Sequence, residues 1–208
     1  MNKREKAQRI QLILNTLFPK ATIPLKHQDP FTLLIAVLLS AQCSDARVNR
    51  VTPKLFAKAS SPQEMSRLSV KEIEECIRPL GLFRTKARRI QALSAILATR
   101  YKGQVPATLK ALEALPGVGH KTASVVLTQA FSKAAFPVDR HIHRLSKRWG
   151  LSSGNKISQT ERALKRIFPK KSWKTLHLQL ILYARAYCPA RGHRLFACPI
   201  CRELKFKK

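Results

Sequence analysis

Helix signals follow one another along almost the whole chain, and no segment shows the alternating pattern of a strand. Apolar residues recur every three or four positions, as at Ile10, Leu14 and Leu17, which places them on one face of a helix. Helix starts are marked by capping pairs such as Ser61 with Glu64. This pattern predicts an all-α fold.

The same signals predict where the helices begin and end. A proline follows Asp29, which is typical of a helix start, and Gly81 and Gly150 are expected where helices stop. The expected helices span residues 3–18, 30–40, 46–59, 62–67, 70–77, 83–101, 109–114, 120–131, 139–149, 158–168 and 173–187.

The charge of the chain indicates a polyanionic partner. It has 40 Lys and Arg against 11 Asp and Glu, a net charge of +29, and the excess is spread along the sequence. A well-solvated surface needs far less net charge, so nucleic acid is the expected partner. The longest apolar run, residues 31–41, is shorter than the roughly 20 residues of a membrane span, and the first residues lack the apolar region of a signal peptide. We therefore expect a cytoplasmic protein with no membrane segment.

Residues 115–123, Leu-Pro-Gly-Val-Gly-His-Lys-Thr-Ala, predict a tight turn between two helices. Gly117 and Gly119 can adopt backbone angles that other residues avoid, so we expect the turn to direct its amides, including that of Val118, outward to a phosphate. Lys121 then lies in the first turn of the next helix, where the helix dipole disfavours a charged ammonium. A neutral lysine amine is a nucleophile.

Asp139 lies eighteen residues after Lys121, at the start of another expected helix. An amine, a carboxylate and a phosphate-binding turn suit chemistry at a sugar carbon of DNA. If the amine attacks C1′ of a nucleotide whose base has been extruded, the carboxylate stabilises the positive charge that develops or takes a proton from the amine. Each residue also has a plainer interpretation, Lys121 as a phosphate contact and Asp139 as a helix cap.

These motifs resemble the helix-hairpin-helix and Gly/Pro-Asp signature of the endonuclease III family, the bifunctional DNA glycosylases and AP lyases. The likeness extends to residues 38–45, Leu-Leu-Ser-Ala-Gln-Cys-Ser-Asp, and to the Gly-Leu-Phe-Arg-Thr-Lys-Ala segment at 81–87. It implies two helical lobes with a DNA cleft between them. One lobe, residues 22–134, would be a six-helix barrel with the hairpin, and the other would combine residues 1–21 and 135–208.

The resemblance also implies roles for individual residues. Lys121 would be the Schiff-base nucleophile and Asp139 the catalytic carboxylate, while Gln42 and Leu82 would enter the duplex when the base flips out. The substrates would be oxidised pyrimidines and abasic sites in double-stranded DNA. The enzyme would remove the damaged base and then cut the strand by β-elimination. The expected enzyme is a monomer associated with the nucleoid.

Two other functions remain open from the sequence alone. A non-catalytic DNA-binding protein would use the hairpin only for phosphate contacts. A monofunctional glycosylase would release a base without cutting the strand. The lysine at position 121 favours the bifunctional family, because similar adenine-mismatch glycosylases lack a lysine at this position.

The C-terminal cysteines depart from the family pattern. The family commonly holds a 4Fe-4S cluster with four cysteines spaced C-x6-C-x2-C-x5-C. This chain has Cys188, Cys198 and Cys201, and Lys207 stands where the fourth cysteine is expected. His193 lies between the first two cysteines, and three Cys with one His is a set that binds structural zinc. An iron-sulfur cluster with an unusual ligand, a zinc ion and no metal are all compatible with the sequence.

Overall fold

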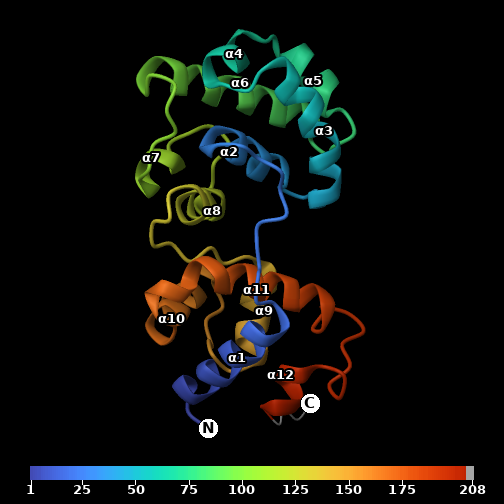
Figure 1. The fold of residues 1–208 in the computed structure, drawn as a ribbon, viewed down its shortest axis with the longest axis vertical. Coiled ribbons are helices and arrows are strands. Elements are labelled where there is room, and N and C mark those ends of the chain that lie inside the picture. Colours follow the sequence, from blue (N-terminus) through green and yellow to red (C-terminus); the bar gives the residue numbers. More distant parts are fainter. Residues whose placement is uncertain (205–208) are drawn as a thin grey trace. The chain divides into compact units, whose positions relative to one another are not determined.

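A computed structural model describes residues 1–204, and these residues are helical with no strand among them. The all-α prediction is therefore confirmed. Lys207, the position expected for a fourth cysteine, lies outside the described residues. The elements are α1 (Lys3–Leu17), α2 (Pro30–Leu39), α3 (Asp45–Lys58), α4 (Pro62–Arg67), α5 (Val70–Ile77), α6 (Phe83–Arg100), α7 (Leu109–Glu113), α8 (His120–Ala130), α9 (Arg140–Arg148), α10 (Ile157–Ile167), a 3-10 helix (Lys170–Ser172), α11 (Trp173–Ala186) and α12 (Pro199–Glu203) (Figure 1).

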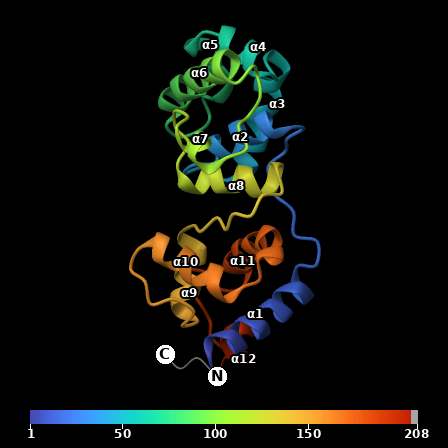
Figure 2. The same cartoon turned by 90° about the vertical axis from the view of Figure 1, so that its left-hand side faces the viewer.

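The chain divides into two compact units. The hairpin unit comprises Ile23–Lys133, with α2 to α8, and the terminal unit combines Met1–Thr22 with Ala134–Lys208. In the hairpin unit α2 is the central helix, because nine of its ten residues are buried. It packs against α8, α3 and α6, and Figure 2 shows α8 beside it. Helices α4 and α5 cover α6.

The terminal unit has its own hydrophobic core. Helix α11 packs against α1 and α9, and α10 packs against α9. The rings of Trp149 and Tyr183 meet edge to face with centroids 5.6 Å apart, and both side chains are fully buried. Ile10 and Leu14 of α1, expected in a core from their spacing, are also fully buried here.

Most helix ends lie within one residue of their predicted positions. The capping pair Ser61 with Glu64 is confirmed as a capping box. Gly150 has a φ of +68°, the left-handed conformation that favours glycine after a helix. The prediction for Gly81 is wrong, since α5 ends at Ile77 and the left-handed residue is Leu82. The short helix α12 and the 3-10 helix were not predicted.

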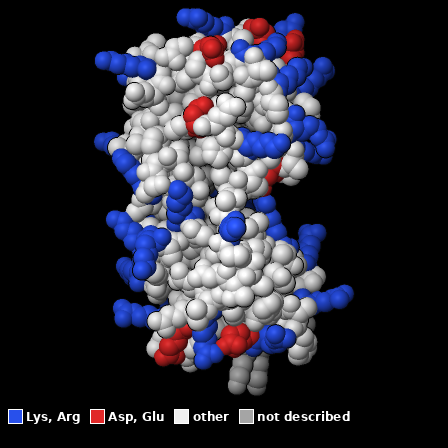
Figure 3. Space-filling view, in the orientation of Figure 1, with Lys and Arg blue, Asp and Glu red and all other residues white. Residues whose placement is uncertain are grey.

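Most of the carboxylates have local structural partners, and the face drawn in Figure 3 shows Lys and Arg side chains on both units. Eight of the 11 acidic residues cap helices or form ion pairs. They are Asp29 and Asp139 as N-caps, Glu5, Glu64 and Glu72 in capping boxes, and Glu113, Glu161 and Glu203 in ion pairs. None of the helices in residues 1–204 combines the length and apolar character that a membrane span requires.

Candidate active site and metal site

The turn between α7 and α8 is built by its proline and glycines. The Val118 amide donates to the Leu115 carbonyl at 3.1 Å, and Gly117 has a φ of +81°. The prediction that the Val118 amide faces outward is therefore wrong, because this amide closes the turn. Proline at the second position and a left-handed glycine at the third are the pattern of a type II turn. A Cβ on Gly117 would lie 2.7 Å from Cδ of Arg89, so both backbone conformation and space require glycine there.

Gly119 has a different reason to be glycine. It is the N-cap of α8, with an extended backbone that any residue can adopt, and a Cβ would meet no described protein atom within 4 Å. No side-chain cap closes this end of α8 within residues 1–204. A bare N-cap at a helix N-terminus is a ready site for a phosphate. The protein's own packing does not require this glycine, whereas close approach of a phosphate would.

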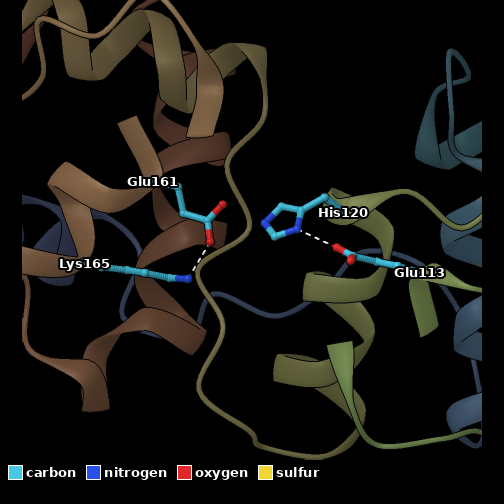
Figure 4. Close-up of polar contacts among 4 residues, drawn as sticks. All are labelled: Glu113, His120, Glu161 and Lys165. Carbon is cyan, nitrogen blue, oxygen red and sulfur yellow. Dashed lines mark hydrogen bonds and ion pairs between the residues drawn. The ribbon is translucent and has the colours of Figure 1, made fainter. Parts of the chain in front are cut away.

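Lys121 is the second residue of α8 and is exposed. The neighbouring His120 places Nδ1 2.6 Å from Oε1 of Glu113, and this pair connects α8 to α7 across the hairpin (Figure 4). A second pair in Figure 4, Glu161 with Lys165, lies within α10 of the terminal unit. Gly117, Gly119 and Lys121 all lie in the turn between α7 and α8 or in the first turn of α8, so the structure places them on one hairpin.

Asp139 belongs to the terminal unit and is the N-cap of α9. Its Oδ1 accepts from the Ile142 amide at 2.9 Å, which fixes the orientation of the half-buried carboxylate. Burial lowers the pKa of the nearby Arg144, and the negative charge of Asp139 is among the effects that oppose this shift. His141 and His143, on the same helix, contact Arg144 and Thr160 respectively.

Gln42 and Leu82 share an unusual backbone. Their φ angles are +58° and +59°, and both side chains are exposed, Leu82 by 58%. Residues other than glycine rarely adopt this conformation, and such strain concentrates at functional positions. Lys102 and Ser132 share the left-handed backbone, but Leu82 adds a large exposed apolar side chain, which is suited to insertion between bases.

Lys86 connects the two segments that carry these residues, and sequence reasoning missed it. Its side chain is buried, and its ammonium donates to the Leu39 carbonyl at 2.9 Å and to Sγ of Cys43 at 3.2 Å. These two partners flank the turn that presents Gln42. Lys86 lies one helical turn after Leu82, whose carbonyl accepts from the Lys86 amide. Its position four residues before the buried Ile90 was the available signal.

Cys188, His193, Cys198 and Cys201 come together in the terminal unit, with one ligand atom of each within 4.8 Å of the others. The three cysteines are buried, and Cys188 Sγ lies 4.0 Å from Cys201 Sγ. These four residues therefore form a site that can hold a metal ion. Cys43 and Cys76 belong to the other unit and take no part.

The three thiols perturb one another. The pKa of Cys198 is lowered because the Cys188 and Cys201 thiols donate to its thiolate, and the pKa values of those two thiols are raised in turn. Without a cation, the group therefore favours one thiolate over three.

Comparison with known proteins identifies relatives of the whole chain. Residues 35–170 match the family described as HhH-GPD superfamily base excision DNA repair protein. The chain is 42% identical over 194 residues to endonuclease III of Bacillus subtilis (strain 168), covering 91% of this chain and 89% of the relative. It is 41% identical over 197 residues to endonuclease III of Escherichia coli (strain K12), covering 94% and 93%.

A solved structure of a trapped covalent intermediate between endonuclease III and DNA is also similar. It superposes with a TM-score of 0.92 and is 41% identical in sequence, covering 99% of this chain and 98% of that one. A non-covalent complex of endonuclease III with DNA matches with the same TM-score and identity.

Proposed function

This chain belongs to the endonuclease III family of HhH-GPD base excision DNA repair proteins, and from that membership we propose which of its residues perform the reaction. The protein is a DNA glycosylase with AP lyase activity that binds double-stranded DNA. Its substrates are oxidised pyrimidines and abasic sites, and it acts on the DNA of the nucleoid.

Lys121 is the nucleophile. Its neutral Nζ forms a bond to C1′ of the damaged nucleotide, and the bond from C1′ to the base breaks, with its electron pair leaving on the base. Loss of a proton from the nitrogen and opening of the sugar give a Schiff base. The imine acidifies a C2′ hydrogen, so a base can remove that proton and the 3′ phosphate leaves by β-elimination. The strand is then cut, and hydrolysis returns the lysine.

Asp139 is the carboxylate of the reaction. As an N-cap it is held in one orientation by the Ile142 amide, so it needs no reorganisation during the reaction. It stabilises the positive charge that develops at the sugar, and it accepts the proton that the attacking amine gives up. Its capping role and its chemical role are compatible, because an ionised carboxylate can serve both.

The hairpin and the two strained residues bind the duplex. The turn of Gly117 and Val118 presents the amides at Gly119 and at the start of α8, and these hold a backbone phosphate, which sets the register of Lys121 on the strand. Gln42 fills the gap left by the extruded base, and Leu82 wedges into the stack. Their left-handed backbones and exposed side chains support these roles.

The observation that carries the proposal is an exposed lysine at the second position of α8, two residues after a bare glycine N-cap. Borohydride trapping tests it on a duplex with one oxidised pyrimidine. The wild-type protein should give a covalent adduct with DNA, and Lys121→Gln should give none while still binding the duplex. Lys71→Gln, which removes one exposed charge from α5, is the matched control and should form the adduct.

The same experiment distinguishes the other functions. Binding without an adduct in the wild-type protein would identify a non-catalytic DNA-binding protein. Base release without strand cleavage, seen on a gel before any alkaline treatment, would identify a monofunctional glycosylase. An adduct that persists in Lys121→Gln would mean that another amine is the nucleophile.

A further inference from the structure

We propose that the C-terminal site holds a single zinc ion, bound by Cys188, His193, Cys198 and Cys201, in place of a 4Fe-4S cluster. The site is built from residues of the terminal unit alone, and the proposal does not depend on the roles proposed above. Three observations carry the proposal: the spacing of the ligand atoms, the chemistry of the fourth ligand and the polar groups around the sulfurs.

The ligand atoms are spaced for one ion. With Zn–S bonds of about 2.3 Å, tetrahedral geometry separates two sulfurs by roughly 3.8 Å. Cys188 Sγ and Cys201 Sγ are 4.0 Å apart, and all four ligand atoms lie within 4.8 Å of one another. A 4Fe-4S cluster places four irons and four sulfides between its ligands, and each ligand binds a different iron. Those ligands must lie farther apart than the ones here, so the site does not fit the cluster.

The fourth ligand is a histidine, which suits zinc. Three thiolates and one imidazole are a known set for structural zinc, whereas a 4Fe-4S cluster is held by four thiolates. Nε2 of His193 is buried and has no hydrogen-bond partner within the described residues. A buried ring nitrogen without a hydrogen-bond partner is energetically costly. A bond from either ring nitrogen to a metal ion would fix the tautomer of the imidazole and make it a ligand.

Each sulfur also faces one hydrogen-bond donor. Nη1 of Arg148 lies 2.9 Å from Cys188 Sγ, and Nε1 of Trp149 lies 3.4 Å from Cys201 Sγ. An arginine and an indole can only donate, so these sulfurs act as acceptors. Such donors around metal-bound thiolates orient the ligands and reduce their charge.

The third sulfur, Sγ of Cys198, also has a hydrogen-bond donor, the hydroxyl of a tyrosine. The Tyr183 hydroxyl is 3.0 Å from Cys198 Sγ, and it accepts from the Ile200 amide at 2.8 Å. With that amide donating to its oxygen, the hydroxyl can direct its own proton to the sulfur. All three sulfurs therefore have a hydrogen-bond donor directed at them, which is the arrangement found around metal-bound cysteine sulfurs.

Metal content tests the proposal directly. Cells expressing the full chain would be grown with both iron and zinc, and the protein purified anaerobically without chelator. We expect about one zinc per chain, no iron and no visible chromophore. His193→Ala should lose zinc, His193→Cys should retain it through a fourth thiolate, and Cys76→Ala, a cysteine outside the site, should retain it as the control.

A second measurement uses only the wild-type protein, so it does not depend on whether the variants fold. Replacement of zinc by cobalt in the wild-type protein should give the absorption of a tetrahedral ion with thiolate-to-cobalt charge transfer. Iron in any stoichiometry with a brown chromophore would overturn the proposal. Wild-type protein that contains no metal and does not take up added zinc or cobalt would also overturn it.

Discussion

Asp139 shows how one side chain can serve the fold and the reaction together. The N-cap of α9 needs an oxygen that accepts from the Ile142 amide, and the chemistry needs a negative charge. Asparagine satisfies the first need as well as aspartate does, but it lacks the charge. The two roles can therefore be separated by substitution.

We expect Asp139→Asn to keep the stability of the protein and lose catalysis. Loss of the carboxylate should slow formation of the trapped adduct by about a hundredfold or more, the usual contribution of a positioned acid or base. Asp139→Ala should also lose about 1 kcal/mol of unfolding free energy, because the cap is removed. Single-turnover trapping and denaturant unfolding of both variants measure the two effects. Equal rates for Asp139→Asn and the wild type would remove Asp139 from the reaction.

Lys86 is a buried cation, and its ammonium donates to a carbonyl and a sulfur. The Leu39 carbonyl lies at the C-terminal end of α2, where the helix dipole favours a cation. A buried charge of this kind is weak support for stability. The role of Lys86 is better explained by its position, because it holds the turn that carries Gln42 against α6.

We expect Lys86→Met to unfold with a free energy within about 1 kcal/mol of the wild type, because an apolar side chain of similar length replaces a buried charge. Affinity for a lesion-bearing duplex should fall roughly tenfold, the equivalent of about one lost hydrogen bond to a charged group. Lys71→Met controls for the lost charge at an exposed position. Titration of labelled duplex and thermal unfolding give both quantities. Unchanged affinity with a large loss of stability would make Lys86 purely structural.

The hairpin of α7 and α8 contains two glycines with different physical reasons. Gly117 serves the turn itself, through its positive φ and the nearby Arg89. Gly119 has an ordinary backbone and open space around it. A helix of this kind usually begins with Ser, Thr, Asp or Asn, whose side chain satisfies the first amides. Glycine at the N-cap of α8 keeps that position open for a phosphate.

Substitution of these glycines should separate stability from DNA binding. Gly119→Ser should raise the unfolding free energy by a few tenths of a kcal/mol, as a better cap, but weaken DNA binding roughly tenfold, because the hydroxyl occupies the phosphate position. Gly117→Ala should cost about 1 to 2 kcal/mol of stability through its left-handed backbone. Denaturant unfolding and DNA titration measure both. Tighter DNA binding by Gly119→Ser would contradict a phosphate at this N-cap.

The sequence predicted the helices well because their ends depend on local chemistry. Capping boxes at Ser61 and Ser69, and the proline after Asp29, act within one turn, so they can be found without the fold. The error at Gly81 has a physical cause. Leu82 takes the left-handed conformation that glycine would usually take. Residue propensities favour glycine in this conformation, so they could not predict a strained leucine.

The surroundings of the site could not be read from the sequence, because they depend on long-range packing. Trp149 and Tyr183 carry the periodicity of core residues, and only the fold shows that their polar atoms reach Cys201 and Cys198. Likewise Lys86 contacts Cys43 across 43 positions of sequence. The spacing of the cysteines left iron, zinc and no metal open, whereas the distances between ligand atoms favour a single ion.

Charge is a property of the whole molecule, and its distribution follows from how the few acidic residues are used. Capping boxes, N-caps and ion pairs occupy eight of the 11 carboxylates. With 40 Lys and Arg against these 11 carboxylates, the chain has a net charge of +29, and Figure 3 shows Lys and Arg side chains on both units. Such a surface attracts DNA over long distances and binds it before any base is inspected.

Binding to undamaged DNA should therefore depend steeply on salt. Each phosphate neutralised contributes about −0.9 to the slope of log affinity against log salt, so about five contacts give a slope of roughly −4.5. Between about 50 and 200 mM salt, the affinity should fall by about 500-fold. Fluorescence anisotropy with a labelled duplex measures the slope, and thermal unfolding at each salt concentration excludes loss of fold. A slope near zero would mean that the cations do not bind phosphate, because counterion release accompanies every such contact whatever the DNA sequence.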